Sequence, residues 1–192
     1  MVTLNEESLK KWQDGGLEYL RYQYPLDENS VVVDFGAYRG EWSDKIFDEY
    51  GCRDILLFDP TDNIHAAKNG RKIQACAWIE NTQVRTNGAF YYTSQLHDNE
   101  IGLHKYEAVD IESHFPPKVD LLKVNIEGAE YYLLPYMLSK NLLQKVKYIQ
   151  IQFHVTDKLD YQAIYKTIFQ ELKKTHTQEW NCPFVWESWR IK

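Results

Sequence analysis

Short apolar runs alternate along the chain with stretches in which apolar residues recur every three or four positions. The runs have the length of buried strands and predict strands at Val31–Val33, Asp54–Phe58, Lys72–Trp78, Val119–Val124 and Tyr148–Phe153. The periodic stretches predict helices at Ser43–Tyr50, Gly128–Leu143 and Tyr161–Lys173. Pro135 is expected to kink the second of these helices or to split it in two. Strands that alternate with helices indicate an α/β fold with a doubly wound, mostly parallel sheet.

Both ends of the chain extend this pattern. Glu6–Tyr24 has near-helical apolar spacing that Gly15 and Gly16 interrupt, so one or two short helices are expected before the main fold. Thr175–Trp180 and Phe184–Ile191 have strand-like patterns joined by a turn. They predict an antiparallel addition at one edge of the sheet.

The region between the third and fourth predicted strands is less regular. Asn87–Thr93 is expected to be extended, and the polar stretch Ser94–Tyr106 is expected to form either a lid over a site or a solvated loop. The length of 192 residues suits a single domain, with a helical extension over residues 1–30 and an α/β core over residues 31–192.

Composition and charge narrow the range of partners. The formal net charge is −6 and the basic residues are scattered, so no nucleic-acid partner is expected. Cys52, Cys76 and Cys182 are widely spaced, which favours free thiols in a reducing compartment. No apolar run approaches the roughly 18 residues of a membrane span, so we expect a cytoplasmic protein without a membrane partner. Pairing of a sheet edge or of the N-terminal helix leaves a homodimer open.

The stretch Val31–Trp42, VVVDFGAYRGEW, carries the first candidate chemistry. Its strand opens into a turn in which Gly36 and Gly40 permit a tight bend and a close backbone approach to a ligand. A dinucleotide-binding turn has glycines at its first, third and sixth positions, whereas the third and sixth positions counted from Gly36 hold Tyr38 and Glu41. The spacing therefore disfavours a nicotinamide-dependent oxidoreductase.

The acid in this turn indicates which ligand it would accept. Asp34 would repel a pyrophosphate, but it suits a ligand with an ammonium and a sulfonium group, directly or through water. S-adenosylmethionine is such a ligand, and an ordinary turn without a ligand is the alternative. The predicted cofactor contacts in this turn are Asp34, Gly36, Ala37, Tyr38 and Gly40.

The ends of the next strands supply further candidates, because the carboxyl ends of parallel strands meet at one edge of a sheet. Asp59 follows Gly36 by roughly 20 residues and is expected to accept hydrogen bonds from both ribose hydroxyls, with Pro60 stiffening the turn. Ala77 and Trp78 are expected to offer backbone and an apolar face to the adenine. A core position is the alternative for Trp78.

Asp120–Glu130, DLLKVNIEGAE, is the second distinctive stretch. Together with Val32–Gly40 it resembles the paired VxDxGAxxG and DLLKxDxEGAE motifs of the FkbM-type methyltransferases, which are class I S-adenosylmethionine-dependent enzymes. Phe58–Pro60 resembles the acid–proline pair of that family, and VDIESHF from Val109 looks like its LDDL-type segment. The resemblance covers about Val31–His154 and implies the Rossmann-like fold of class I methyltransferases.

Two positions depart from the family pattern. Asn125 stands where the family usually has Asp, and Asp59 stands where Glu is commoner. A magnesium-dependent mechanism would draw oxygen ligands from Asn125, Glu127 and Gln152. Because the usual acid is replaced at position 125, we expect a mechanism without a metal.

The resemblance also implies a reaction, which is O-methylation of a hydroxyl on a sugar, a glycan or a related small molecule. His154 follows the fifth strand and is the expected general base, because imidazole titrates near the working pH. Asn125 and Glu127 are further catalytic candidates, and Glu127 and Glu130 are expected to orient the substrate or the cofactor ammonium. A catalytically silent module that binds S-adenosylmethionine or a partner is the alternative.

Overall fold

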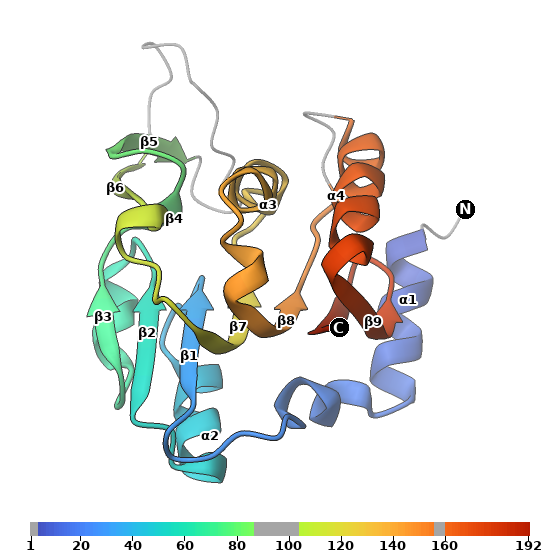
Figure 1. Ribbon diagram of the computed structural model, residues 1–192, viewed down its shortest axis with the longest axis horizontal. Coiled ribbons are helices and arrows are strands. Elements are labelled where there is room, and N and C mark those ends of the chain that lie inside the picture. The colour runs from blue at the N-terminus through green and yellow to red at the C-terminus, as the bar shows by residue number, and fades with distance from the viewer. Residues whose placement is uncertain (1–3, 87–103, 156–159) are drawn as a thin grey trace.

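The computed structural model describes residues 4–86, 104–155 and 160–192 and shows an α/β architecture (Figure 1). The main sheet has seven strands in the order β3-β2-β1-β7-β8-β10-β9. Strand β10 runs antiparallel to both of its neighbours, β8 and β9, and the other pairs of this sheet are parallel. The strands are β1 (Val31–Phe35), β2 (Asp54–Phe58), β3 (Arg71–Ile73), β7 (Val119–Val124), β8 (Val146–Ile151), β9 (His176–Cys182) and β10 (Trp186–Ile191).

This topology confirms the predicted doubly wound, mostly parallel sheet with an antiparallel C-terminal hairpin. The hairpin does not simply extend the edge of the parallel sheet in chain order. Strand β10 lies between β8 and β9, so the antiparallel strand is inside the sheet and β9 forms its edge. The carboxyl ends of β1, β2, β7 and β8 therefore still meet at one edge of the sheet.

Three helices form the two layers around the sheet: α2 (Glu41–Tyr50), α3 (Glu130–Ser139) and α4 (Tyr161–Thr175). Helix α3 continues through Pro135, and the chain then leaves the helix at Asn141, whose φ of 56° is left-handed. A separate 3-10 turn, η4 (Leu143–Lys145), follows. Of the two predicted effects of Pro135, a split of the helix is wrong, because the break comes after Ser139, and a kink stays a prediction.

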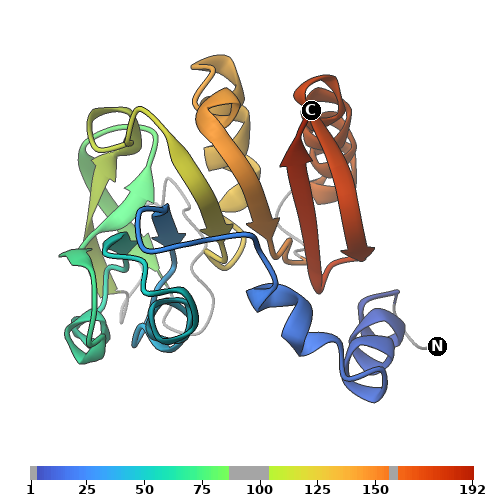
Figure 2. The ribbon, with the colours of Figure 1, turned by 60° about the horizontal axis from the view of Figure 1, so that its bottom comes forward.

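The two faces of the sheet are covered by different elements (Figure 2). On one face, residues such as Val33, Leu122 and Ile149 pack against α3 and α4. On the other face, Val32 and Leu121 belong to a cluster that includes residues of α2 and Tyr24. The alternation follows from the strand period of two, which sends successive side chains to opposite faces.

A second, smaller sheet was not expected from the sequence. It has the order β4-β6-β5 and consists of β4 (Cys76–Trp78), β5 (Thr82–Thr86) and β6 (His104–Asp110). The predicted strand Lys72–Trp78 is wrong as one element, because a turn from Ala75 N to Ile73 O divides it between the two sheets. The small sheet lies beyond the carboxyl ends of β2 and β3 (Figure 1).

The predictions for Asn87–Thr93, and for most of Ser94–Tyr106, fall outside the described residues. The last part of the second stretch is described, and there Tyr106 lies in strand β6 rather than in a loop. Two further 3-10 turns, η2 (Asp62–Ala66) and η3 (Ile111–Ser113), complete the connections.

The N-terminal segment forms two short helical elements, as predicted. They are α1 (Leu4–Asp14) and the 3-10 helix η1 (Leu17–Tyr22), and the left-handed Gly16 joins them. Trp12 of α1 packs in a cluster with Cys182 and Trp186 of the C-terminal hairpin. The first and last elements of the chain are therefore neighbours in the fold.

Candidate active site

A cavity of about 370 Å³ opens at the carboxyl ends of β1, β2 and β7. We call it the main cavity. Its walls come from the turn after β1, the turn after β2, the start of the small sheet and the loop after β7. Six of the nine predicted cofactor residues line it, and they are Gly36, Tyr38, Asp59, Pro60, Ala77 and Trp78. The predicted catalytic residues Asn125 and Glu127 line it as well.

The glycine turn lies in direct backbone contact with the loop after β7. Gly36 has a φ of 80°, and a Cβ atom placed on it would lie 1.8 Å from the carbonyl oxygen of Asn125. A residue with a side chain would therefore force the two loops apart. Lys123 Nζ donates to the Gly36 carbonyl at 2.7 Å and ties the same two segments together.

Asp34 has a different place from the one expected. Its side chain is fully buried, Lys123 Nζ lies 2.7 Å from Oδ1, and Ser43 Oγ donates to Oδ2 at 2.5 Å. Asp34 is not among the residues that line the main cavity. The expectation that it faces a cationic ligand is corrected accordingly, because its charge is neutralised within the protein by Lys123.

Asp59 remains on the wall of the main cavity and also organises the turns around it. Its Oδ2 accepts a hydrogen bond from Tyr38 N at 2.8 Å, and its Oδ1 accepts from Thr61 N and Thr61 Oγ1 at 2.9 and 2.6 Å. Each carboxylate oxygen has two lone pairs, so both of those on Oδ1 are used and one on Oδ2 is left for a further donor. The backbone of Tyr38 is held in a left-handed conformation with a φ of 50°.

The far wall of the main cavity is apolar. Ala77, Trp78 and Val84 come from the small sheet, and all three are buried apart from the surface they present to the cavity. Cys76 also lines this wall, and burial, with a smaller contribution from the charge of Asp59, raises the pKa of its thiol to about 12. The thiol therefore stays protonated at neutral pH.

Besides Asp34, two predicted cofactor residues do not line the main cavity. Gly40 has a φ of 80°, and a Cβ atom on it would lie 2.2 Å from Cβ of Ala67. Its glycine is therefore explained by packing of the α2 N-terminus against η2. Ala37 is buried in the cluster beneath the turn, and its N–H donates to the Phe58 carbonyl at 3.0 Å.

Two residues of the loop after β7 that carry oxygen acceptors, Asn125 and Glu127, line the main cavity. Oδ1 of Asn125 is buried and has no hydrogen-bond partner within the described part of the chain. Glu127 follows two residues later in a left-handed conformation with a φ of 55°, which is uncommon for a residue with a side chain. A strained residue and an unpartnered polar atom on one cavity wall are typical of a binding site.

His154 lies at the end of β8 between two carboxylates. Its Nε2 lies 3.3 Å from Glu127 Oε2, and its Nδ1 lies 2.9 Å from Glu130 Oε1. Glu130 is fully buried, and it also accepts hydrogen bonds from the backbone N–H groups of His154 at 2.6 Å and Gly128 at 2.9 Å. This acid therefore ties the loop after β7 to the loop after β8.

The surroundings of His154 change its expected role. Burial lowers the pKa of the imidazole, but the hydrogen bonds and negative charges of Glu127 and Glu130 outweigh it and raise the pKa to about 10. The hydrogen bond from His154 in turn lowers the pKa of Glu127. The expectation that His154 titrates near the working pH is therefore wrong, since the imidazole is protonated at neutral pH in this arrangement.

Lys123 is the site residue that the sequence reasoning missed. The signal was present, since a lysine inside the apolar run VDLLKV requires a buried partner. Its register opposite Asp34 across the β1–β7 pair identifies that partner only once the strands are aligned.

The oxygens considered for a metal do not share one wall. Asn125 and Glu127 line the main cavity, whereas Gln152 lines a separate cavity beside the N-terminal segment. Over residues 4–86, 104–155 and 160–192, no group of three or more His, Cys, Asp or Glu side chains is arranged to hold a metal ion. In the same ranges, every helix is too short or too polar to cross a membrane.

Several solved structures with a similar architecture are methyltransferases. The methyltransferase FkbM from Methylobacillus flagellatus KT aligns with a TM-score of 0.57 at 11% identity, over 88% of this chain and 45% of that chain. An rRNA methylase from Streptococcus thermophilus aligns with a TM-score of 0.53 at 11% identity, over 91% of this chain and 94% of that chain. A dimethyladenosine transferase from Plasmodium falciparum aligns with a TM-score of 0.50 at 12% identity, over 93% of this chain and 62% of that chain.

The chain thus spans less than half of the FkbM structure but nearly the whole of the rRNA methylase. No protein-family model matches the sequence, and no curated protein sequence matches it. Similarity at such low identity shows the fold and leaves the substrate open. The chain has the α/β fold of class I S-adenosylmethionine-dependent methyltransferases.

Proposed function

We propose that the protein is an S-adenosylmethionine-dependent methyltransferase that acts on a hydroxyl of a sugar, a glycan or a related small molecule. The observation that carries the proposal is the main cavity itself. It combines a carboxylate at the end of the second strand, an apolar wall from the small sheet and an unpartnered amide oxygen after β7. In α/β sheets, ligands bind at this carboxyl edge.

The nucleoside half of the cofactor fits one end of the main cavity. Asp59 keeps a free lone pair on Oδ2 for a ribose hydroxyl, because Tyr38 N uses one of the two lone pairs of Oδ2 and Thr61 uses both of those on Oδ1. Ala77, Trp78 and Val84 form a wall on which an adenine ring would pack. This assignment narrows the role expected of Asp59 from both ribose hydroxyls to one, and it gives Trp78 a place on the wall.

The amino-acid half fits the opposite end. Gly36 allows the turn and the loop after β7 to approach closely, and Asn125 and Glu127 offer oxygen acceptors on that side. An ammonium group requires such acceptors. We therefore assign to Asn125 and Glu127 the contact with the ammonium that the sequence assigned to Asp34.

When bound, S-adenosylmethionine supplies a methyl group on a sulfonium, which is an electrophile with a neutral leaving group. The protein then has to hold the acceptor oxygen in line and to take up the hydroxyl proton. The pKa of His154 is raised and that of Glu127 is lowered, so Glu127 is the unprotonated group on the cavity wall at neutral pH and is assigned to receive that proton. We assign His154 to a positioning role, since its imidazole holds the Glu127 carboxylate at 3.3 Å.

Calorimetric titration with S-adenosylhomocysteine and with 5′-methylthioadenosine, which lacks the amino-acid half, tests this assignment. We expect Asp59→Asn to weaken both ligands by about tenfold or more, because a charge-assisted hydrogen bond to the ribose is lost. Glu127→Gln is expected to weaken S-adenosylhomocysteine alone. Asp62→Asn is the matched control, since Asp62 is exposed and does not line the main cavity.

The result that contradicts the proposal is the absence of binding heat for both nucleosides with the unmodified protein. If S-adenosylhomocysteine binds equally well to Glu127→Gln, the assignment of the ammonium contact is wrong while the cofactor assignment stands. Melting temperatures of the variants without ligand identify any that fail to fold.

A second candidate function is a catalytically silent module that binds the cofactor. The observation that favours it is the position of His154 between two carboxylates. They raise the pKa of the imidazole, so His154 is not available as a neutral general base. A radiolabelled methyl-transfer screen over sugars and glycans separates the two candidates. Cofactor binding without transfer to any acceptor supports the silent module, and transfer to one of them excludes it.

A further inference from the structure

A second cavity, of about 290 Å³, lies between the N-terminal segment and the sheet. We call it the N-terminal cavity. It lies beside residues from α1, from η1, from the loop after β8 and from the start of β10. The residues that decide its chemistry are Leu9, Trp12, Gln13, Glu18, Gln152 and Trp186.

This cavity belongs to the same edge of the sheet as the main cavity. Gln152 directly follows β8, and its N–H donates to the Val124 carbonyl at the end of β7 at 2.9 Å. Asn125, on the wall of the main cavity, is the residue that follows Val124. The two cavities are therefore lined from adjacent strand ends, with Asn125 and Gln152 as neighbours between them.

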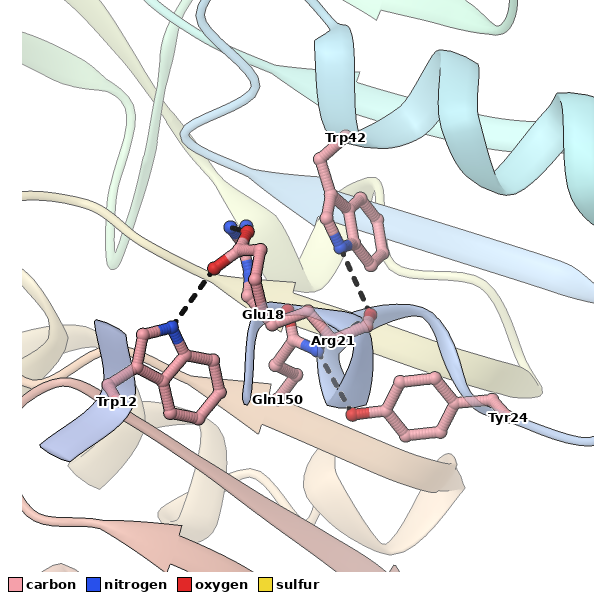
Figure 3. A network of polar contacts seen from close by, with 6 residues as sticks. All are labelled: Trp12, Glu18, Arg21, Tyr24, Trp42 and Gln150. Carbon is pink, nitrogen blue, oxygen red and sulfur yellow. Dashed lines mark hydrogen bonds and ion pairs between the residues drawn. The ribbon is translucent and has the colours of Figure 1, made fainter. Parts of the chain in front are cut away.

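The wall beside η1 is fixed by a network of polar contacts (Figure 3). The Arg21 carbonyl accepts hydrogen bonds from Trp42 Nε1 at 3.3 Å and from Gln150 Nε2 at 2.9 Å. Trp42 belongs to α2 and Gln150 to β8, so the N-terminal segment is anchored to both. The Arg21 guanidinium in turn lies 4.0 Å from the centre of the Trp186 ring.

The same network neutralises the charge on the cavity wall. Glu18 is the charged residue among those that line the N-terminal cavity in the described part of the chain. Its carboxylate pairs with the Arg21 guanidinium and accepts a hydrogen bond from Trp12 Nε1 at 3.1 Å. The remaining polar side chains are the amides of Gln13 and Gln152, which both donate and accept hydrogen bonds.

These walls suit an uncharged ligand with hydroxyl groups and an apolar ring face. An anion would meet Glu18 without a cation on the wall, and a cation would compete with Arg21 for the same carboxylate. Amides complement hydroxyls, and Leu9, Trp12 and Trp186 provide apolar surface. The volume is at the low end of the roughly 300–1,000 Å³ of ligand pockets, which suits a single ring.

We propose that the N-terminal cavity binds the methyl acceptor, and that this acceptor is a neutral polyol of the size of one sugar ring. The proposal rests on the function proposed above, because the acceptor must lie beside the methionine end of the main cavity. It assigns specificity to the N-terminal segment, through Gln13 and Glu18, and to Gln152 on the sheet.

Saturation-transfer NMR on the intact protein tests the proposal without requiring turnover. The probes are methyl glycosides of glucose, mannose, galactose, rhamnose, fucose and xylose, with glucose 6-phosphate and glucosamine as charged counterparts. We expect transfer to at least one neutral glycoside and weaker transfer to the charged sugars. Gln13→Trp fills the cavity from an exposed position on α1 and is expected to weaken that glycoside by about tenfold or more.

Lys11→Trp is the matched control, since Lys11 is an exposed residue of the same helix and does not line the cavity. It is expected to bind the glycoside as the unmodified protein does. The proposal is overturned if no neutral glycoside receives saturation, if the charged sugars bind better, or if Gln13→Trp binds like Lys11→Trp. Circular dichroism of both variants verifies that they fold.

A parallel titration with S-adenosylhomocysteine separates this proposal from the proposed function. If the cofactor product binds and no glycoside does, the assignment of the N-terminal cavity fails alone. If a glycoside binds and is lost in Gln13→Trp but the cofactor product does not bind, the sugar site stands and the proposed methyl transfer fails.

Discussion

The two faces of the main sheet differ in the kind of residue that they bury. The face beneath α3 and α4 is almost entirely apolar, and the cluster there contains Leu122 and Ile149. The face beneath α2 and the N-terminal segment carries a row of buried polar residues in adjacent register, and these are Asp34, Lys123, Gln150 and Ser188. The N-terminal cavity lies on the side of the polar face, because α1 and η1 line it, whereas the main cavity is walled by the turns after β1, β2 and β7 and by the small sheet.

This difference between the two faces shows which of them fixes the positions of neighbouring segments. Apolar packing tolerates exchange of similar residues, whereas a buried polar group needs a partner at one defined position. The row supplies such partners, because Lys123 meets Asp34 and Gln150 meets the Arg21 carbonyl. The polar face therefore fixes the position of the glycine turn and of the N-terminal segment, while the apolar face supplies bulk stability.

Breaking the polar row is expected to have the largest effect on stability. Lys123→Met leaves the fully buried Asp34 without a counter-ion, which typically costs about 3–5 kcal/mol. Urea unfolding measures the free energy of unfolding. The double variant Asp34→Asn/Lys123→Met should recover much of the loss, because no charge then remains unpaired.

The neighbouring residue on the other face provides the comparison. Leu122→Ala is expected to lose about 2–5 kcal/mol through the cavity it creates. No change at Asp34 should restore this loss. Equal rescue of both variants by Asp34→Asn would show that the two faces are not independent.

Glu187 is an exception on the apolar face and predicts a dependence on pH. Burial raises the pKa of its carboxyl, and hydrogen bonds from Trp189 and Tyr165 lower it in part. The pKa in the folded protein is about 7, compared with the ordinary value of 4.5. Because the folded pKa is the higher one, the folded state binds more protons, and the stability it confers is lost as the pH rises from 4.5 through 7.

The free energy of unfolding of the unmodified protein should therefore fall between pH 4.5 and 7 by on the order of 3 kcal/mol relative to Glu187→Gln. Denaturant unfolding at a series of pH values measures the difference. Parallel pH profiles of the two proteins would contradict the assignment of this carboxyl.

His154 extends the comparison to a higher range of pH. Its folded pKa of about 10 exceeds the ordinary 6.5, so the contribution of its pairing to stability is complete below pH 6.5 and is lost as the pH rises through 10. His154→Gln should remove this decline. The same unfolding series checks it, and a decline that persists in the variant would assign it to another group.

Removal of one anchor of the N-terminal segment is expected to have the smallest effect. Trp42→Phe keeps a six-membered aromatic ring but removes the indole N–H that donates to the Arg21 carbonyl, which still accepts from Gln150. The expected loss is about 0.5–1.5 kcal/mol. Hydrogen exchange of residues 17–22 should increase more than exchange of β1, and a uniform increase would argue against a local anchor.

The apolar pattern predicts most of the main sheet, because buried parallel strands are continuous apolar runs. It predicts the division of Lys72–Trp78 poorly, since KIQACAW has no proline or glycine to mark the turn at Gln74–Ala75. It also omits β5 and β6, whose short polar sequences pair with each other across a long connection. Such pairing depends on contacts far apart in the chain.

The sequence predicted where the candidate site residues lie better than it predicted what each of them does. The strand ends place Asp34 and Asp59 correctly at one edge, yet only the register across β1 and β7 shows that Lys123 neutralises Asp34. In the same way, His154 was identified from its position after β8. Its protonation depends on Glu127 and Glu130, which reach it from a different loop.

The neighbourhood of α1 and the C-terminal hairpin has a consequence for the order of events during synthesis. Trp12 leaves the ribosome early, whereas its packing partners Cys182 and Trp186 are made much later. Until then, the indole of Trp12 has no hairpin to cover it. During synthesis the N-terminal cavity is therefore incomplete and its aromatic surface is exposed. This surface stays uncovered, or is shielded by a chaperone, until β10 has been translated.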